Sequence, residues 1–321
     1  MSRVAAIDCG TNSIRLLVAD LEETDSGLVL TDVHREMRVV RLGEGVDATG
    51  SLQPAAIDRT WAALADYNAI LRASGAIRVR MAATSATRDA ANRQDFVSMV
   101  RSTLGQDPEV ITGVEEAELS FRGAVADLDP AEGPFMVVDI GGGSTEMVVG
   151  SIVDGEVQLA GSVSMDIGCV RITERLLHGD PPTAHEIIQA RAWAHDILLE
   201  GLKQLPVEQV RTLVPVSGTA TTVAAAALGL SAYDPNLIHL SRIPVGKVKA
   251  AAHFFLGATR AHRAALGYMH SGRVDVIGGG ALVLETLVDL VRERTAVDDI
   301  IVSEHDILDG LAMSLAWPRT N

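Results

Sequence analysis

One short pattern occurs twice in this 321-residue chain, with an offset of 131 residues between the two copies. In each copy an apolar run leads to an aspartate, Asp8 or Asp139, then to a glycine- and hydroxyl-rich stretch, and then to a second apolar run. Such a pattern predicts a buried strand, a tight turn and a second strand. Because the pattern is repeated, we expect two related half-molecules whose turns face one cleft.

The two turns carry groups that suit phosphate and a divalent metal. Glycine-rich turns expose backbone N–H groups that bind anions, and an adjacent carboxylate can hold a cation. A single such turn is also typical of an ordinary hairpin tip with an aspartate cap, but its repetition favours binding. We therefore predict that phosphate is bound by Gly10, Thr11, Asn12 and Ser13 in the first copy, and by Gly141, Gly142, Gly143 and Ser144 in the second.

Composition narrows the class of protein. A net charge of −15 argues against a general nucleic-acid binder. The apolar stretches are broken by charged residues, which argues against a membrane span. The two cysteines lack disulfide or zinc-site spacing, and the N-terminus lacks a signal-peptide pattern. We expect a cytoplasmic globular protein that binds neither nucleic acid nor membrane.

The order of predicted elements is also repeated. Three consecutive strands are followed by alternating helices and strands, first in residues 1–127 and again in residues 128–321. This order predicts a duplicated α/β fold of two domains, each with a mixed sheet, flanking an interdomain cleft. Residues 83–89 are predicted as a turn. A C-terminal helix near residues 305–318 is expected to pack back on the first domain.

Four acidic residues are candidates for chemistry. Glu146 follows the second turn, and Arg15 occupies the equivalent position of the first copy. Asp139 and Glu146 can both approach Mg²⁺, although an exposed strand position is the alternative for Glu146. Glu115 and Glu116 open a predicted helix, where the helix dipole alone favours acidic residues. One of them can instead orient or deprotonate a water molecule, and the residues alone leave the choice between the two open.

Two further stretches join a predicted strand to a predicted helix. Thr84–Arg88 offers hydroxyls and a guanidinium, a combination that grips phosphate, and a helix cap with a solvated arginine is the alternative. Ser217, Gly218 and Thr219 have the same strand-to-helix form and are a third candidate phosphate-binding segment. The nine histidines show no ligand spacing, and neither a Ser-His-Asp nor a Cys-His arrangement can be argued.

Together these motifs resemble the exopolyphosphatase / guanosine pentaphosphate phosphohydrolase (Ppx/GppA) family, a branch of the actin–Hsp70–sugar kinase (ASKHA) superfamily. The resemblance covers essentially the whole chain and implies a duplicated actin-like (ribonuclease H-like) fold. The combination of the second turn with the Glu-Glu-Ala helix start is specific to the family. The matching segments are Asp8–Ser13, Ala83–Asn92, Gly113–Ala117, Asp139–Glu146, Gly168–Arg171 and Ser217–Ala220.

The resemblance also implies roles for individual residues. It assigns the general base to Glu116, a phosphate-binding loop arginine to Arg88, and metal-linked acids to Asp139 and Glu146, with Asp8 across the cleft. The implied reaction is Mg²⁺-assisted attack of water on the terminal phosphoanhydride of inorganic polyphosphate, with Mn²⁺ as the alternative metal. Dimers are common in the family, so a homodimer is the expectation.

Three other functions stay open at this point. The nearest is a 5'-phosphohydrolase acting on guanosine pentaphosphate (pppGpp). A sugar kinase would need an acceptor pocket and an adenosine-binding glycine pair; Gly278–Gly280 could be misread as such a pair, but the Glu-Glu-Ala helix start favours a hydrolase. A non-catalytic sensor of polyphosphate or nucleotide is the third.

The chain departs from the family pattern at two places. Longer members carry a C-terminal HD-type domain that this sequence lacks, so we expect a preference for shorter polyphosphate chains. Many members have Gly-Leu-Arg-Glu-Gly near the end, whereas residues 306–310 read Asp-Ile-Leu-Asp-Gly. A phosphate contact from that arginine is therefore not expected.

Overall fold

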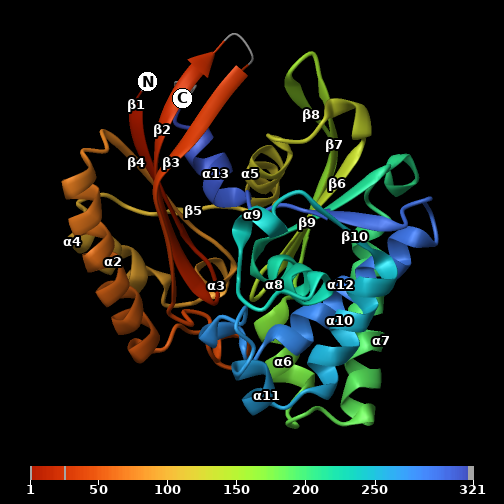
Figure 1. Ribbon diagram of the computed structural model, residues 1–321. Coiled ribbons are helices and arrows are strands. Elements are labelled where there is room, and N and C mark those ends of the chain that lie inside the picture. Colours follow the sequence, from red (N-terminus) through yellow and green to blue (C-terminus); the bar gives the residue numbers. More distant parts are fainter. Residues whose placement is uncertain (1, 25–26, 317–321) are drawn as a thin grey trace. The chain divides into compact units, whose positions relative to one another are not determined.

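The computed structural model of the chain (Figure 1) describes residues 2–24 and 27–316. Contacts divide the chain into two compact units. Unit 1 holds the described residues up to Gly123 and those from Ile307 onward, and unit 2 is Ala124–Asp306. The chain therefore passes between the units twice, and the first crossing lies a few residues before the expected boundary after residue 127.

Unit 1 is built on a five-stranded mixed sheet with the order β3-β2-β1-β4-β5. β1 and β2 pair antiparallel, as do β2 and β3, whereas β4 and β5 continue the sheet in parallel with β1. Three strands in sequence followed by strand–helix alternation is the order that the sequence predicted. The strands are β1 (Ser2–Cys9), β2 (Ser13–Thr24), β3 (Gly27–Val39), β4 (Arg78–Ala83) and β5 (Glu109–Val110).

Both faces of this sheet are covered, because apolar residues of β2 alternate between two cores. Leu16 and Val18 pack with residues of α2 and α4, and Leu17 and Ala19 pack with residues of α13. The segment predicted as a turn over residues 83–89 contains a short helix, α3, so that prediction was wrong in part. The helices are α1 (Val46–Thr49), α2 (Pro54–Ser74), α3 (Ser85–Asp89), α4 (Arg93–Leu104), α5 (Gly113–Val125) and α13 (Ile307–Met313).

Unit 2 repeats this sheet and adds one strand. Its order, β10-β11-β9-β6-β7-β8, matches that of unit 1 except for β10, an antiparallel edge strand that the sequence did not predict. The β7–β8 hairpin turns at Asp154 and Gly155, both at positive φ, as expected for this dipeptide. The strands are β6 (Phe135–Ile140), β7 (Thr145–Val153), β8 (Glu156–Met165), β9 (Thr212–Val216), β10 (Ser241–Pro244) and β11 (Asp299–Val302).

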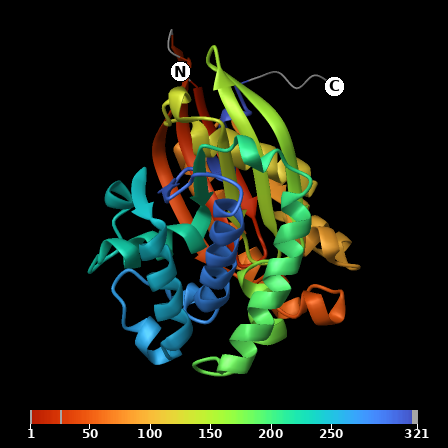
Figure 2. The same ribbon diagram turned by 90° about the vertical axis from the view of Figure 1, so that its right-hand side faces the viewer.

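The helices of unit 2 surround α12, which packs against α6, α7, α8 and α10 (Figure 2). The glycines of α12 serve this packing: a Cβ on Gly280 would lie 2.6 Å from Thr219 Oγ1 of α8, and one on Gly279 would lie 2.5 Å from Thr173 Oγ1 of α6. The Gly278–Gly280 run is therefore a helix-packing feature. The helices are α6 (Cys169–Leu176), α7 (Ala184–Leu202), α8 (Ser217–Leu228), α9 (Pro235–Ile238), α10 (Val245–Gly257), α11 (Arg260–Ala264) and α12 (Ile277–Arg292), with 3-10 turns at Pro130–Glu132 (η1), Val207–Gln209 (η2) and Ser271–Arg273 (η3).

A helix that crosses a membrane needs about 20 mostly apolar residues. Within the described residues, none of the helices combines the length and the apolar character needed to cross a bilayer.

Candidate active site

The two aspartate-linked turns have the same backbone geometry. Gly10 N–H donates to Ser13 O at 2.9 Å, and the equivalent Gly141 N–H donates to Ser144 O at 3.0 Å. In each turn these glycine amides therefore close the turn itself. The structure thus confirms, at the level of individual hydrogen bonds, the duplication that the sequence predicted.

The second turn is held from one side by the start of α6. Cys169 N–H donates to Gly141 O at 2.9 Å, and the N–H groups of Val170 and Arg171 donate to Gly142 O. With the carbonyls occupied, the N–H groups of Gly142 and Gly143 find no acceptor among the residues that the structure describes. Adjacent backbone N–H groups of this kind form an anion-binding concavity.

Gly168, the residue before α6, allows the start of α6 to approach the backbone of Gly142 closely. A Cβ at this position would lie 2.5 Å from both C and O of Gly142, a clash with backbone that a side-chain movement cannot relieve. We expect Gly168→Ala to lower the free energy of unfolding by roughly 1–3 kcal/mol and to weaken phosphate binding by displacing the turn. Urea denaturation and calorimetric titration with inorganic phosphate measure the two effects.

Gly246 in α10 is the matched control, because a Cβ there meets no atom within 4 Å. Gly246→Ala should be neutral or stabilising by up to about 1 kcal/mol, since alanine favours the helix. Equal stability of the two variants would contradict the close-contact role of Gly168.

The two copies differ at one cross-strand pair. In unit 1, Asp8 lies opposite Arg15 in register, and the Arg15 guanidinium donates to Asp8 Oδ2 at 2.7 and 3.0 Å. In unit 2, Asp139 lies opposite Glu146. These two carboxylate side chains belong to residues only 6% and 1% exposed. Like charges opposite each other in a sheet are unfavourable, so the unit 2 pair has the composition of a cation site.

Hydroxyl groups orient both carboxylates of unit 2. Ser164 Oγ donates to Glu146 Oε1 at 2.7 Å, and Ser217 Oγ donates to Asp139 Oδ1 at 2.5 Å. Ser217 opens α8 with φ 60°, a strained conformation for a residue other than glycine. The hydroxyl of Thr219 instead faces Ile140 O at 3.4 Å, so it contacts the strand and not the carboxylate pair.

Arg273 lies beside the Ser217–Thr219 segment and was not predicted from the sequence. A Cβ on Gly218 would lie 2.4 Å from Arg273 Cζ, so the guanidinium packs directly against the backbone at Gly218. Its Nη1 donates to Thr222 Oγ1 at 3.2 Å. Nothing in the local sequence around η3 signals this position, because the contact joins segments more than fifty residues apart.

In unit 1 the structure brings Glu116 and Arg88 together. Arg88 Nη1 donates to Glu116 Oε2 at 3.2 Å and to Ile111 O at 3.1 Å, and Glu116 is 8% exposed. Glu115 turns elsewhere: it pairs with Arg80 at 2.9 Å, and its side chain is 43% exposed. The geometry therefore distinguishes two acids that the sequence did not.

The Arg88 segment is attached to the first turn. Thr84 N–H donates to Cys9 O at 3.2 Å, and the hydroxyls of Thr11 and Ser85 lie 2.8 Å apart. Since β1 and β4 are parallel neighbours, their carboxyl ends place the first turn and α3 side by side. Unit 1 thus gathers the predicted turn residues, Arg88 and Glu116 at one edge of its sheet.

The shared strand order and the repeated aspartate–turn unit define the duplicated actin-like (ribonuclease H-like) class of α/β proteins. Within that class the chain belongs to the Ppx/GppA phosphatase family, whose profile matches residues 19–315. It is 54% identical to Exopolyphosphatase 2 of Mycobacterium tuberculosis, over 98% of this chain and 99% of that protein.

Solved structures agree with this assignment. An exopolyphosphatase-like protein superposes with a TM-score of 0.92 at 39% identity, covering 98% of both chains. The Aquifex aeolicus member of the Ppx/GppA family superposes with a TM-score of 0.79 at 31% identity, covering 98% of this chain and 97% of that one. The family and the fold class predicted from the motifs are therefore confirmed.

Proposed function

We propose that this protein is an exopolyphosphatase, a hydrolase that releases terminal orthophosphate from inorganic polyphosphate. The family is one of phosphatases, and the relative with 54% identity is named Exopolyphosphatase 2. The observation that carries the proposal is the buried Asp139–Glu146 pair beside a turn whose Gly142 and Gly143 N–H groups have no acceptor within the described residues. Such a combination suits a phosphate and its metal counterion.

The donor set fits Mg²⁺, with Mn²⁺ as the alternative. Both ions prefer carboxylate oxygens and water, and in our proposal Asp139 and Glu146 would hold the ion, each oriented by a serine hydroxyl. Asp8 remains a third candidate, although its pairing with Arg15 makes it a poorer ligand. When bound, the metal neutralises negative charge on the reacting phosphoryl oxygens.

The protein's own groups then perform binding and proton transfer. The N–H groups of Gly142 and Gly143 bind oxygens of the terminal phosphate, and Arg273 supplies positive charge beside the Ser217–Thr219 segment. Glu116, oriented by Arg88, accepts a proton from the attacking water as the new P–O bond forms. The bond to the bridging oxygen breaks, orthophosphate leaves, and the polyphosphate is shorter by one unit.

The substrate assignment is tested by phosphate release from polyphosphate of defined length, guanosine pentaphosphate and ATP, each with and without Mg²⁺. We expect the highest kcat/KM with polyphosphate, and loss of release when a chelator removes the metal. A higher kcat/KM with guanosine pentaphosphate would make that compound the substrate in place of polyphosphate. Absence of phosphate release from all three compounds would contradict the proposal that the protein is a hydrolase. Light scattering on the same sample tests the homodimer expected from the resemblance.

A further inference from the structure

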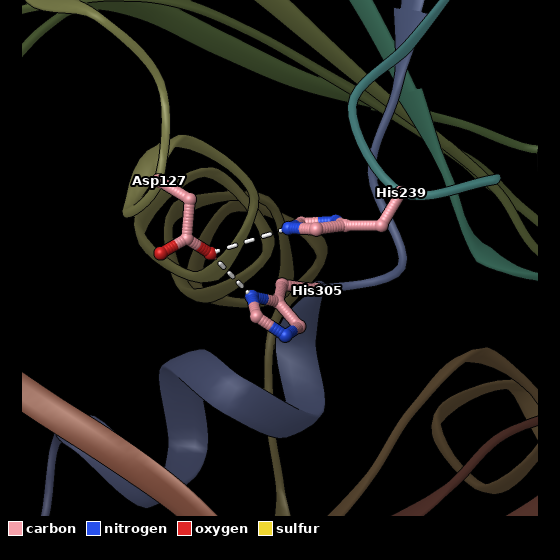
Figure 3. Close-up of side chains that lie close together, drawn as sticks. All are labelled: Asp127, His239 and His305. Atoms are coloured by element: carbon pink, nitrogen blue, oxygen red, sulfur yellow. Dashed lines mark hydrogen bonds and ion pairs between the residues drawn. The ribbon is translucent and has the colours of Figure 1, made fainter. Parts of the chain in front are cut away.

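Asp127, His239 and His305 converge in unit 2 (Figure 3). Asp127 follows α5, His239 ends α9, and His305 follows β11, so three separate segments supply the side chains. His305 Nδ1 lies 2.7 Å from Asp127 Oδ2, and His239 Nε2 lies 3.5 Å from the same oxygen. All three ligand atoms lie within 4.8 Å of one another.

These distances are close to those of a metal centre. Zinc bonds of 2.0–2.2 Å in tetrahedral geometry place neighbouring donor atoms about 3.3 Å apart. The two distances to Asp127 Oδ2 bracket that value, so small side-chain movements suffice. We propose that Asp127, His239 and His305 form a binding site for a divalent transition-metal ion of the Zn²⁺ class, with a fourth position for water.

The chemistry of the three groups supports this assignment. Two imidazoles and one carboxylate are a donor set that suits zinc and neighbouring transition metals, and not Mg²⁺ or Ca²⁺. A single carboxylate oxygen, Asp127 Oδ2, faces a ring nitrogen of each histidine. The imidazole rings are already stacked obliquely with centroids 4.5 Å apart, which places both nitrogens on the carboxylate side.

The position along the chain gives the site a structural role. Asp127 lies just after the first crossing between the units, and His305 lies just before the second crossing, at Asp306–Ile307. A bound ion would link these two segments of unit 2 directly to each other and to His239 at the end of α9. We therefore expect a bound ion to raise the stability of unit 2.

Metal binding through His239 Nε2 also requires the imidazole proton to move to the other ring nitrogen, a change that NMR can detect. Glu304 N–H donates to His239 Nδ1 at 3.2 Å, so the neutral imidazole carries its proton on Nε2, the nitrogen that faces Asp127. Coordination through Nε2 moves that proton to Nδ1, where it opposes the Glu304 N–H. We expect the Glu304 amide resonance and the His239 ring-nitrogen resonances to shift when zinc binds, as long as His239 is a ligand.

The test is titration of the full chain with ZnCl₂ by calorimetry, for the wild type and for Asp127→Asn, His239→Gln and His305→Gln. We expect one zinc per chain at this site, and an affinity lower by at least about 10- to 100-fold in each variant, since loss of a ligand exceeds loss of an outer-shell partner. Zinc should raise the Tm of the wild type and not of the variants. Melting without metal shows that each variant is folded.

Two control variants distinguish this site from other zinc-binding groups. His185→Gln removes an exposed histidine of the same unit and should bind zinc with the affinity of the wild type. Glu146→Gln tests whether zinc binds at the proposed phosphate site instead, and it should also keep the wild-type affinity for zinc. Absence of zinc binding by the wild type, wild-type affinity in the three cluster variants, or an equal loss in His185→Gln would each overturn the proposal.

Discussion

Glu116→Gln is expected to lower the rate of phosphate release by about 10²- to 10⁴-fold, the usual contribution of a general base. The amide has the size of the carboxylate and still offers an oxygen to Arg88 Nη1, which now donates at 3.2 Å. It cannot accept a proton from water. The loss should therefore fall on kcat, with KM and the Tm close to those of the wild type.

Glu115→Gln is the matched control on the adjacent residue of α5. It weakens a half-exposed ion pair with Arg80, which affects stability by less than about 1 kcal/mol, and it should leave kcat unchanged. Initial rates with polyphosphate of one defined length measure both variants. Full activity of Glu116→Gln, or an equal loss in both variants, would remove Glu116 from the role of base.

Substitutions at the equivalent positions 15 and 146 are expected to have opposite effects. Glu146→Gln should impair activity and not stability, whereas Arg15→Gln should impair stability. Glu146→Gln should reduce activity on the order of 10³-fold, because a metal contributes several kcal/mol to stabilising the transition state. The same change should leave the metal-free protein unaltered or more stable by up to about 1 kcal/mol, since it removes a carboxylate opposite Asp139.

Arg15→Gln removes the guanidinium that pairs with the buried Asp8 at 2.7 Å. Removal of one partner of such a pair costs roughly 3 kcal/mol, because the remaining charge loses its compensation. Urea denaturation in the presence of a chelator measures the stability of both variants without metal. Rates of phosphate release at increasing Mg²⁺ concentration measure their activity. A large destabilisation by Glu146→Gln, or none by Arg15→Gln, would contradict the assignment of a metal site to unit 2 and a structural ion pair to unit 1.

Much of the fold was predictable, because its main signals are local. The strands before and after each turn follow from apolar runs that end at Asp8 and Asp139, and the hairpin at Asp154–Gly155 follows from its turn residues. The edge strand β10 was missed because it has only four residues and because its neighbour in the sheet, β11, lies more than fifty residues later in the chain. The helix α3 was missed because its five residues also suit a turn.

The candidate site was only partly predictable, because only some of its residues belong to a local sequence pattern. The turn residues carry a local pattern. The choice of Glu116 over Glu115 depends on which face of α5 meets Arg88, and that contact spans 28 residues. Arg273 and the Asp127–His239–His305 cluster have no local pattern at all, since their partners are brought together by sheet order and helix packing.

The duplication, the mixed α/β sheets and the glycine-rich turns follow from the amino-acid sequence alone, because each depends on residues within one strand–turn–strand unit. Which polar side chains meet depends on the tertiary structure: Arg15 pairs with Asp8, Ser217 with Asp139, and Arg88 with Glu116. Side-chain pairing depends on strand register, helix rotation and burial, and these are set by packing across the whole of each unit. The same pattern therefore became an ion pair in one unit and a candidate metal site in the other.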